Sequence, residues 1–183
     1  MGRGRPAVAG ILSVKVGLPP IARSDARVLI LGSLPGDASL AAAQYYAHPR
    51  NHFWRLVGSV IARDLVPMDH PARIEALQSA GMALWDVVGE ATRLGSLDQQ
   101  IRNARVNDLR AFAATLPHLR AVAFNGNKAA ALAGRAFDGL QLEVLHLPSS
   151  SPAYTIDAAT KGAAWAALGR YLKPLENGDG IPI

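Results

Sequence analysis

The chain has 183 residues and a formal net charge of +5; 50% of its residues are hydrophobic and 18% are charged. These values predict a single globular domain with a core of useful size and exclude an intrinsically disordered chain. The absence of cysteine excludes disulfides, thiolate nucleophiles, thiolate zinc sites and cysteine-ligated iron–sulfur clusters, and no apolar run reaches the roughly 18 residues that span a membrane.

The two ends of the chain differ in character from its centre. The start, "MGRGRPAVAGILSVKVGLPP", has a short apolar stretch that Lys15 interrupts and no clean cleavage site, so it is not predicted to be a signal peptide. We expect an N-terminal extension over residues 1–18, a domain over 19–174 and a loose tail over 175–183. A cytoplasmic location is expected. The positive charge permits a polyanionic partner without requiring one.

Short apolar runs alternate with helical patterns along the chain. Three buried strands are predicted at 27–32, 82–88 and 120–126, and a fourth begins at 142. The patterns with helical spacing are 38–46, 51–65, 71–81, 106–117, 127–137 and 156–175. Residues 89–103 are expected to be polar and rich in turns. The alternation predicts an α/β fold with a mostly parallel sheet and helices on both faces.

Polar, turn-forming sequences follow three of the predicted strands: "GSLPGD" (32–37), "FNGN" (124–127) and "HLPSSSPAY" (146–154). In parallel-sheet folds, ligands bind at the carboxyl ends of the strands. Taken singly, each stretch has an ordinary structural interpretation: a strand-to-helix turn, a turn residue with an unusual backbone angle, or a flexible surface loop. Together they favour a binding site that offers amides and hydroxyls to an anion or a base edge.

The stretch "YYAHPRNHFW" (45–54) holds four aromatic rings, although aromatic residues are only 6% of the chain. Tyr46 is expected in a loop where its ring can stack on a planar ligand. Asn51 is expected to cap the following helix, to point into the site, or both. His48 and His52 have i, i+4 spacing, but Pro49 between them argues against one helix, so no metal site is predicted.

Two acidic residues leave a further alternative open. Asp86 and Asp98 could form an acid/base pair, or they could cap and brace the turn-rich segment around them. The residues by themselves favour the second interpretation.

The ordered set "GSLPGD…YYAHPRNHFW…FNGN…LPSSSPAY", together with "GSLDQQIRNARVND", resembles the uracil-DNA glycosylase superfamily. The similarity is greatest to its DNA-deoxyinosine (hypoxanthine-DNA) glycosylase group and covers about residues 19–172. It implies a three-layer α/β/α sandwich with a central, mostly parallel four-stranded sheet. The implied activity is hydrolysis of the bond between a deaminated base, uracil or hypoxanthine and also xanthine, and its deoxyribose. The nucleotide would be flipped out of the duplex during base excision repair.

The resemblance also implies roles for individual residues. Leu34 stands where other branches place a polar residue that positions the attacking water, so Asn51 is the implied water-positioning residue, with Asp37 in reserve. Tyr46 would stack on the base and Asn125 would read its edge, with Ser33 also in the base-binding pocket. The implied DNA contacts are the phosphate-binding Ser149, Ser150 and Ser151, followed by Pro152, Ala153 and Tyr154, of which Tyr154 could act as the wedge.

The resemblance further implies a monofunctional enzyme, because no lysine lies in a matched motif. No cofactor or metal is expected. The partner would be damaged DNA, double- or single-stranded, bound by a monomer without membrane contact in the nucleoid. One alternative is a non-catalytic nucleic-acid-binding protein on the same fold, which Leu34 motivates. The other is a small-molecule hydrolase, which the serine loop, residues 147–154, motivates. A G-x-S-x-G nucleophile motif is missing, which argues against the hydrolase.

Overall fold

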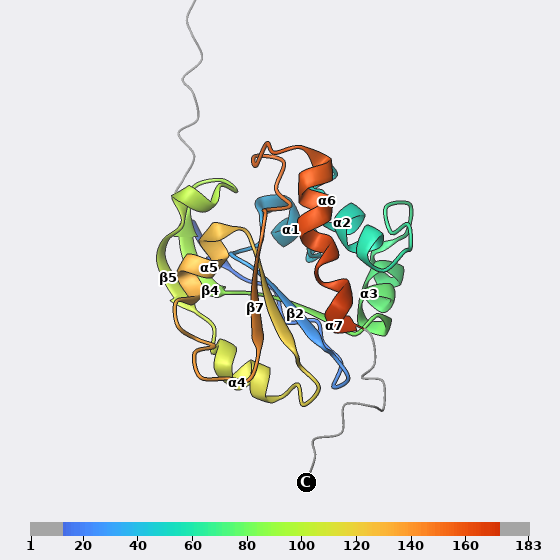
Figure 1. The fold of residues 1–183 in the computed structure, drawn as a ribbon. Helices are drawn as coiled ribbons and strands as arrows, with labels where there is room; N and C mark the ends of the chain where they lie inside the picture. Colours follow the sequence, from blue (N-terminus) through green and yellow to red (C-terminus); the bar gives the residue numbers. More distant parts are fainter. Residues whose placement is uncertain (1–12, 173–183) are drawn as a thin grey trace, which may run out of the picture.

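A four-stranded parallel sheet forms the centre of the protein, whose structure is a computed structural model describing residues 13–172 (Figure 1). In spatial order its strands are β3 (Met82–Asp86), β2 (Val28–Gly32), β6 (Ala121–Asn125) and β7 (Glu143–Leu147). Mostly apolar side chains make up β2, β3 and β6, which are too short for helices and are buried on both faces, whereas β7 at the edge of the sheet is largely exposed. The predicted α/β class and four-stranded sheet are confirmed.

Alternate residues of β2 face opposite sides of the sheet, as the period of a strand requires. Leu29 and Leu31 belong to one buried cluster and Val28 and Ile30 to a second, so the protein has two cores separated by the sheet. The first core is covered by α4 (Leu109–Ala114) and α5 (Asn127–Ala133). The helices of the second core are α2 (Phe53–Val60), α3 (His70–Ser79), α6 (Ala158–Ala166) and α7 (Gly169–Leu172). The result is the expected three-layer sandwich.

The predicted helices are shorter in the structure, and their boundaries have local causes. Asp69, Asp108 and Asp157 each accept a hydrogen bond from a first-turn N–H and begin α3, α4 and α6. The chain turns through a left-handed residue, Ala62 at φ 54°, so α2 ends at Val60. The pattern predicted over 38–46 forms only α1 (Asp37–Ala42).

A second sheet corrects the expectation for residues 89–103. It is antiparallel, in the order β1 (Ser13–Val16), β4 (Val88–Arg93) and β5 (Arg102–Val106), with the 3-10 helix η1 (Asp98–Gln100) between the last two. Register shifts interrupt the pairing of β4 with β5. The prediction of turns missed these strands because they are polar and irregularly paired, and because one partner of β4, the strand β1, lies far away in the sequence.

The strand β1 also bears on the predicted domain boundaries. The predicted extension includes residues 13–16, and in the structure these pair with β4 from Ser13↔Arg93 to Val16↔Glu90. Residues 1–12 and 173–183 lie outside the described residues, so the remaining parts of the extension and the tail stay predictions. Within residues 13–172, no helix is both long and apolar enough to cross a membrane.

Candidate active site

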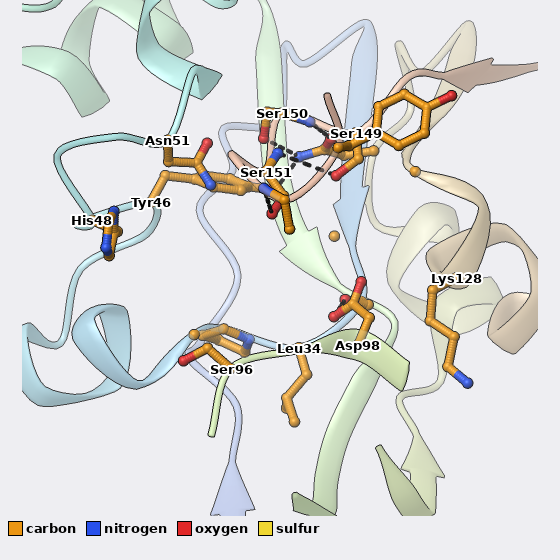
Figure 2. Close-up of a pocket in the computed structure, with 18 of the residues that line it drawn as sticks. Leu34, Tyr46, His48, Asn51, Ser96, Asp98, Lys128, Ser149, Ser150 and Ser151 are labelled. Carbon is orange, nitrogen blue, oxygen red and sulfur yellow. Dashed lines mark hydrogen bonds between the residues drawn. The ribbon is translucent and has the colours of Figure 1, made fainter. Parts of the chain in front are cut away.

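A cavity of about 800 Å³ opens at the carboxyl ends of the parallel strands (Figure 2). Its walls come from the loop after β2, the segment after α1, the turn before η1, the β6–α5 junction and the loop after β7. The lining residues are drawn from 32–39, 45–51, 96–99, 125–128 and 148–154, together with Asp86. The three predicted polar loops therefore meet in one site, together with the aromatic stretch.

Tyr46 lies in the segment that follows α1, and one face of its ring packs against another aromatic ring. The ring stacks on Phe53 with 3.8 Å between the centroids and 10° between the planes. Its backbone is left-handed, with φ 52°, a conformation that is uncommon for a residue with a side chain and that is found at functional sites. The Tyr46 ring lines the cavity, as predicted for a stacking residue.

Asn125 ends strand β6 and joins two parts of the site. Its amide nitrogen donates to the Tyr46 hydroxyl and to Ser150 Oγ, both at 2.9 Å, and its Oδ1 accepts from Ser150 N–H at 2.8 Å. Both amide hydrogens are therefore used inside the protein. For contact with a base edge, Asn125 has only the second lone pair of its Oδ1. Its hydrogen bonds hold Tyr46 and the serine loop in position.

Asn51 lies between the aromatic segment and α2. It precedes His52, the N-cap residue of α2, and its Oδ1 accepts from Phe53 N–H, the first N–H of the helix, at 2.9 Å. The side chain also lines the cavity and points toward Tyr46 and the serine loop (Figure 2). Both interpretations of Asn51 are thus compatible with its position, since capping occupies one oxygen lone pair and leaves the amide nitrogen for a ligand.

Asp37 occupies a different environment. It is the first residue of α1, and its carboxylate lies 3.0 Å from Lys15 Nζ and 3.7 Å from an Arg93 nitrogen. It is not among the residues that line the cavity. Arg93 is itself fully buried and donates to the carbonyls of Leu34, Pro35 and Gly95. This cluster fastens the loop after β2 to β4, which is a structural use of Asp37.

Of the four serines predicted for the site, two are buried and hydrogen-bonded within the protein and two are partly exposed to the cavity. Ser33 Oγ donates to Asp98 Oδ1 at 2.6 Å. Ser150 is buried, holds Asn125, and accepts from His52 N–H through its carbonyl at 3.0 Å. Ser149 and Ser151 are half-buried on the cavity wall.

The tip of the same loop projects outward. Pro152, Ala153 and Tyr154 are exposed, Tyr154 to 42%. The buried Lys161 on α6 holds the loop by donating to the carbonyls of Ser151 at 3.3 Å and Tyr154 at 2.6 Å. These positions suit the predicted DNA-contacting role, which stays a prediction.

Asp86 is the residue whose importance sequence reasoning underestimated. It ends β3, lines the cavity and is 3% exposed, and its Oδ2 has no hydrogen-bond partner in the described part of the chain. Burial, and next the negative charge of Asp98, raise the pKa of Asp86 to about 7. Burial likewise raises the pKa of Asp98. The only sequence signal was an acid at the end of an apolar run.

The Asp86 carboxyl fits beside Tyr46 because Gly32 has no side chain. Gly32 is paired with Asp86 across β2 and β3. A Cβ at position 32 would overlap Asp86 Oδ1 and lie 3.0 Å from the Tyr46 hydroxyl. Glycine is required here by this close approach of side chains rather than by a turn.

A polar cavity at the carboxyl ends of a parallel sheet with helices on both faces is the usual place of a ligand-binding or active site in α/β proteins. The family model that describes the Uracil DNA glycosylase superfamily matches residues 19–170. The chain belongs to the uracil DNA glycosylase superfamily. It is accordingly a DNA glycosylase, a hydrolase of N-glycosyl bonds, and its setting is base excision repair.

Three similar proteins support this placement. A hypoxanthine DNA glycosylase of Methanosarcina barkeri is 43% identical over 114 residues, 62% of this chain and 72% of the relative. One of Methanosarcina acetivorans is 36% identical over 158 residues, 86% of this chain and 99% of the relative. A solution NMR structure from M. acetivorans, provisionally assigned as a uracil DNA glycosylase, has a TM-score of 0.79 at 36% identity and covers 87% of this chain and 99% of that one.

Proposed function

We propose that this DNA glycosylase is monofunctional, that it flips a deaminated base out of DNA, and that hypoxanthine is its preferred base. The observation that carries the proposal is the meeting of Tyr46, Asn51 and the serine loop around one cavity. The cavity volume of about 800 Å³ can accommodate a base and its sugar. A base stacked in a duplex cannot reach the carboxyl ends of buried strands, so the nucleotide must leave the stack. The names of the two Methanosarcina relatives support hypoxanthine.

Each wall of the cavity has a proposed part in binding. The Tyr46 ring, backed by Phe53, stacks on the flipped base, which gains from aromatic contact irrespective of its identity. Ser149 and Ser151 contact the phosphates next to the lesion, and the exposed loop tip from Pro152 to Tyr154 enters the space that the base leaves.

Asn51 is the proposed water-positioning residue. Cleavage in this reaction develops positive charge on the sugar and negative charge on the base, so the attacking water needs orientation more than a strong base. The Asn51 amide lines the cavity and can orient such a water, whereas the side chain of Leu34, packed in the first core, has no polar atom.

The lysines support a monofunctional reaction. Within residues 13–172, Lys15 pairs with Asp37 and Lys161 is bonded to two carbonyls. Lys128 lines the cavity, but its side chain is directed away from Asn51 and the serine loop (Figure 2). Borohydride trapping, which captures a Schiff base between a lysine and the sugar, is expected to yield no covalent complex.

A cleavage assay on labelled duplexes tests the proposal. Each duplex carries one hypoxanthine, uracil or xanthine, and alkali cuts the abasic site that a glycosylase leaves. We expect the fastest cleavage at hypoxanthine. Asn51→Ala is expected to slow single-turnover cleavage by about 10²-fold or more while retaining binding to the lesion duplex.

Asn51→Ser is the matched control for the helix cap, because a serine hydroxyl keeps an acceptor for the first turn of α2. If loss of the cap were the cause, Asn51→Ser would recover both the melting temperature and the rate. Recovery of the melting temperature alone supports the water-positioning role. Full activity of Asn51→Ala would contradict it, and wild-type protein that binds but cleaves no lesion would contradict the proposed reaction.

A further inference from the structure

The carboxyl of Asp86 is a buried acidic group in the cavity to which none of the roles above assigns a function. Its Oδ2 lacks a hydrogen-bond partner among residues 13–172, and its side chain is nine-tenths buried or more. Its backbone is anchored, since Asn107 Nδ2 donates to the Asp86 carbonyl at 2.9 Å. A buried polar atom without a partner costs free energy, and such atoms persist where a ligand completes the contact.

The surroundings of Asp86 determine which form of the carboxyl is present. The charged or titratable groups that face it are Tyr45 and Tyr46 from the segment after α1, Arg93 on β4 and Asp98 on η1. Burial is the largest influence on the pKa of Asp86 and Asp98 the next, and both favour the neutral acid; Arg93 and the neighbouring Tyr45 hydroxyl act in the opposite direction. The resulting pKa of about 7 leaves a large fraction of Asp86 protonated at neutral pH, which is the condition for an effective general acid.

We propose that the protonated carboxyl of Asp86 donates a hydrogen bond to a ring nitrogen of the flipped purine and transfers its proton to that nitrogen as the base leaves. This inference rests on the proposed function, because it requires a purine in the cavity. Purines have unprotonated ring nitrogens that can accept a hydrogen bond from the protonated carboxyl. The ionised carboxylate could not donate such a bond, and it would repel the negative charge that develops on the departing base.

The step balances as follows. The C1′–N9 bond breaks and its electron pair leaves with the base, while the Asp86 O–H proton moves to a ring nitrogen, giving a neutral free base and a carboxylate. The water held at Asn51 adds its oxygen to C1′. Its surplus proton returns to the Asp86 carboxylate through solvent, so the acid is restored and one water is consumed.

The test is the pH dependence of single-turnover cleavage of a hypoxanthine duplex by the full chain at saturating enzyme. The wild-type rate constant is expected to be level below a pH of about 7 and to fall about tenfold for each pH unit above it. Asp86→Asn has nearly the same shape and can donate a hydrogen bond but cannot transfer a proton. It is expected to be about 10²-fold slower at about pH 6 and to show no such decline.

Asp98→Asn separates proton transfer from a merely structural effect. Removing its negative charge should move the midpoint of the wild-type decline to lower pH without abolishing the decline, because Asp98 raises the pKa of Asp86. Asp25→Asn, an exposed acid in the loop before β2, is the control and should reproduce the wild-type profile. Melting temperatures establish that each variant is folded, and Asp98→Asn keeps the test decisive if Asp86→Asn does not fold.

The outcomes distinguish the two proposals. Cleavage of hypoxanthine by the wild type with a flat profile, or a wild-type rate and decline in Asp86→Asn, overturns the role of Asp86 and leaves the proposed function standing. Wild-type protein that cleaves no lesion overturns the proposed function and, with it, this inference.

Discussion

At the scale of the residue, the site depends on side chains whose ordinary preferences are overridden. Tyr46 adopts a left-handed backbone, Asn125 uses both amide hydrogens internally, and Asp86 keeps a buried oxygen without a partner in the described part of the chain. The Tyr46 backbone and the Asp86 oxygen cost free energy in the folded state, and the hydrogen bonds of Asn125 commit its donors to the protein. Their occurrence in one cavity is what favours a functional interpretation over a purely structural one.

Asp86 should also make the stability of the protein depend on pH. Its pKa of about 7 in the folded state lies above the usual 3.8, so the folded state binds this proton more tightly than the unfolded chain does. The contribution of Asp86 to stability is therefore fully present below about pH 4 and is lost as the pH rises toward 7. The loss relative to the non-titrating Asp86→Asn variant is about 4 kcal/mol.

Urea unfolding of both proteins at several pH values measures this difference. The stability of Asp86→Asn relative to wild type should increase between about pH 4 and 7 and stay level above that range. A difference that is the same at every pH would contradict the neutral buried acid.

At the scale of the element, the loop after β7 is positioned from two sides. Asn125 at the end of β6 holds Ser150, and Lys161 on α6 holds the carbonyls of Ser151 and Tyr154. The Lys161 ammonium also lies 5.4 Å from the centre of the Tyr154 ring. The loop that is expected to enter DNA is therefore fastened to the sheet and to a helix, with its tip exposed.

Lys161→Met should loosen this loop without altering the base pocket. Hydrogen bonds from a charged donor contribute about 1.5–3 kcal/mol each, so we expect the Kd for a lesion duplex to rise about tenfold or more. The single-turnover rate at saturating enzyme should change by less than about threefold, because Asn51 and Asp86 remain in place. Fluorescence anisotropy and single-turnover kinetics measure the two quantities.

Arg105→Gln on β5 removes the same charge from an exposed side chain outside the cavity lining, and it serves as the control. An equal rise in Kd in both variants would show that only charge matters. A normal Kd in Lys161→Met would show that the loop does not need this anchor.

At the scale of the whole molecule, the net charge of +5 and a second cavity suggest a path for the DNA backbone. This cavity of about 460 Å³ shares Tyr46, His48 and Arg50 with the first and adds Arg55 and other residues of the α2 side. Arg50 and Arg55 are exposed. The two cavities are adjacent, since they share five lining residues, and Arg50, Arg55 and Arg73 lie in the lining of the second. Binding as a monomer remains a prediction.

Arg50→Gln should reduce the salt dependence of DNA binding. Each phosphate neutralised by a cation contributes about 0.9 to the slope of log K against log salt concentration. The slope should therefore fall by about 0.9 in Arg50→Gln and stay at the wild-type value in Arg105→Gln, measured by anisotropy over a salt series. An unchanged slope in Arg50→Gln would remove Arg50 from the DNA contact.

Local patterns predicted the central strands and most helices, because a buried apolar run and a helical period depend on neighbouring residues. They failed for β4 and β5, which are polar and paired with register shifts, and for the pairing of β4 with β1, which is distant in sequence. For the site, the motifs indicated Asn51, Tyr46, Asn125 and the serine loop, and all of these lie at the cavity. A sequence motif does not show which residues contact each other in space, so it could not show that Asp37 forms ion pairs with Lys15 and Arg93.

The sequence by itself determined the fold class, the edge of the sheet that carries the site and, through its ordered motifs, the superfamily. Only the tertiary structure decided the state of individual groups: that Ser150 and the amide hydrogens of Asn125 are hydrogen-bonded, and that Asp86 is buried with an oxygen that has no partner among residues 13–172. The physical reason is that a strand or a helix follows from nearest neighbours. The protonation and hydrogen bonding of a buried side chain depend instead on groups from four or five different elements that only folding brings together.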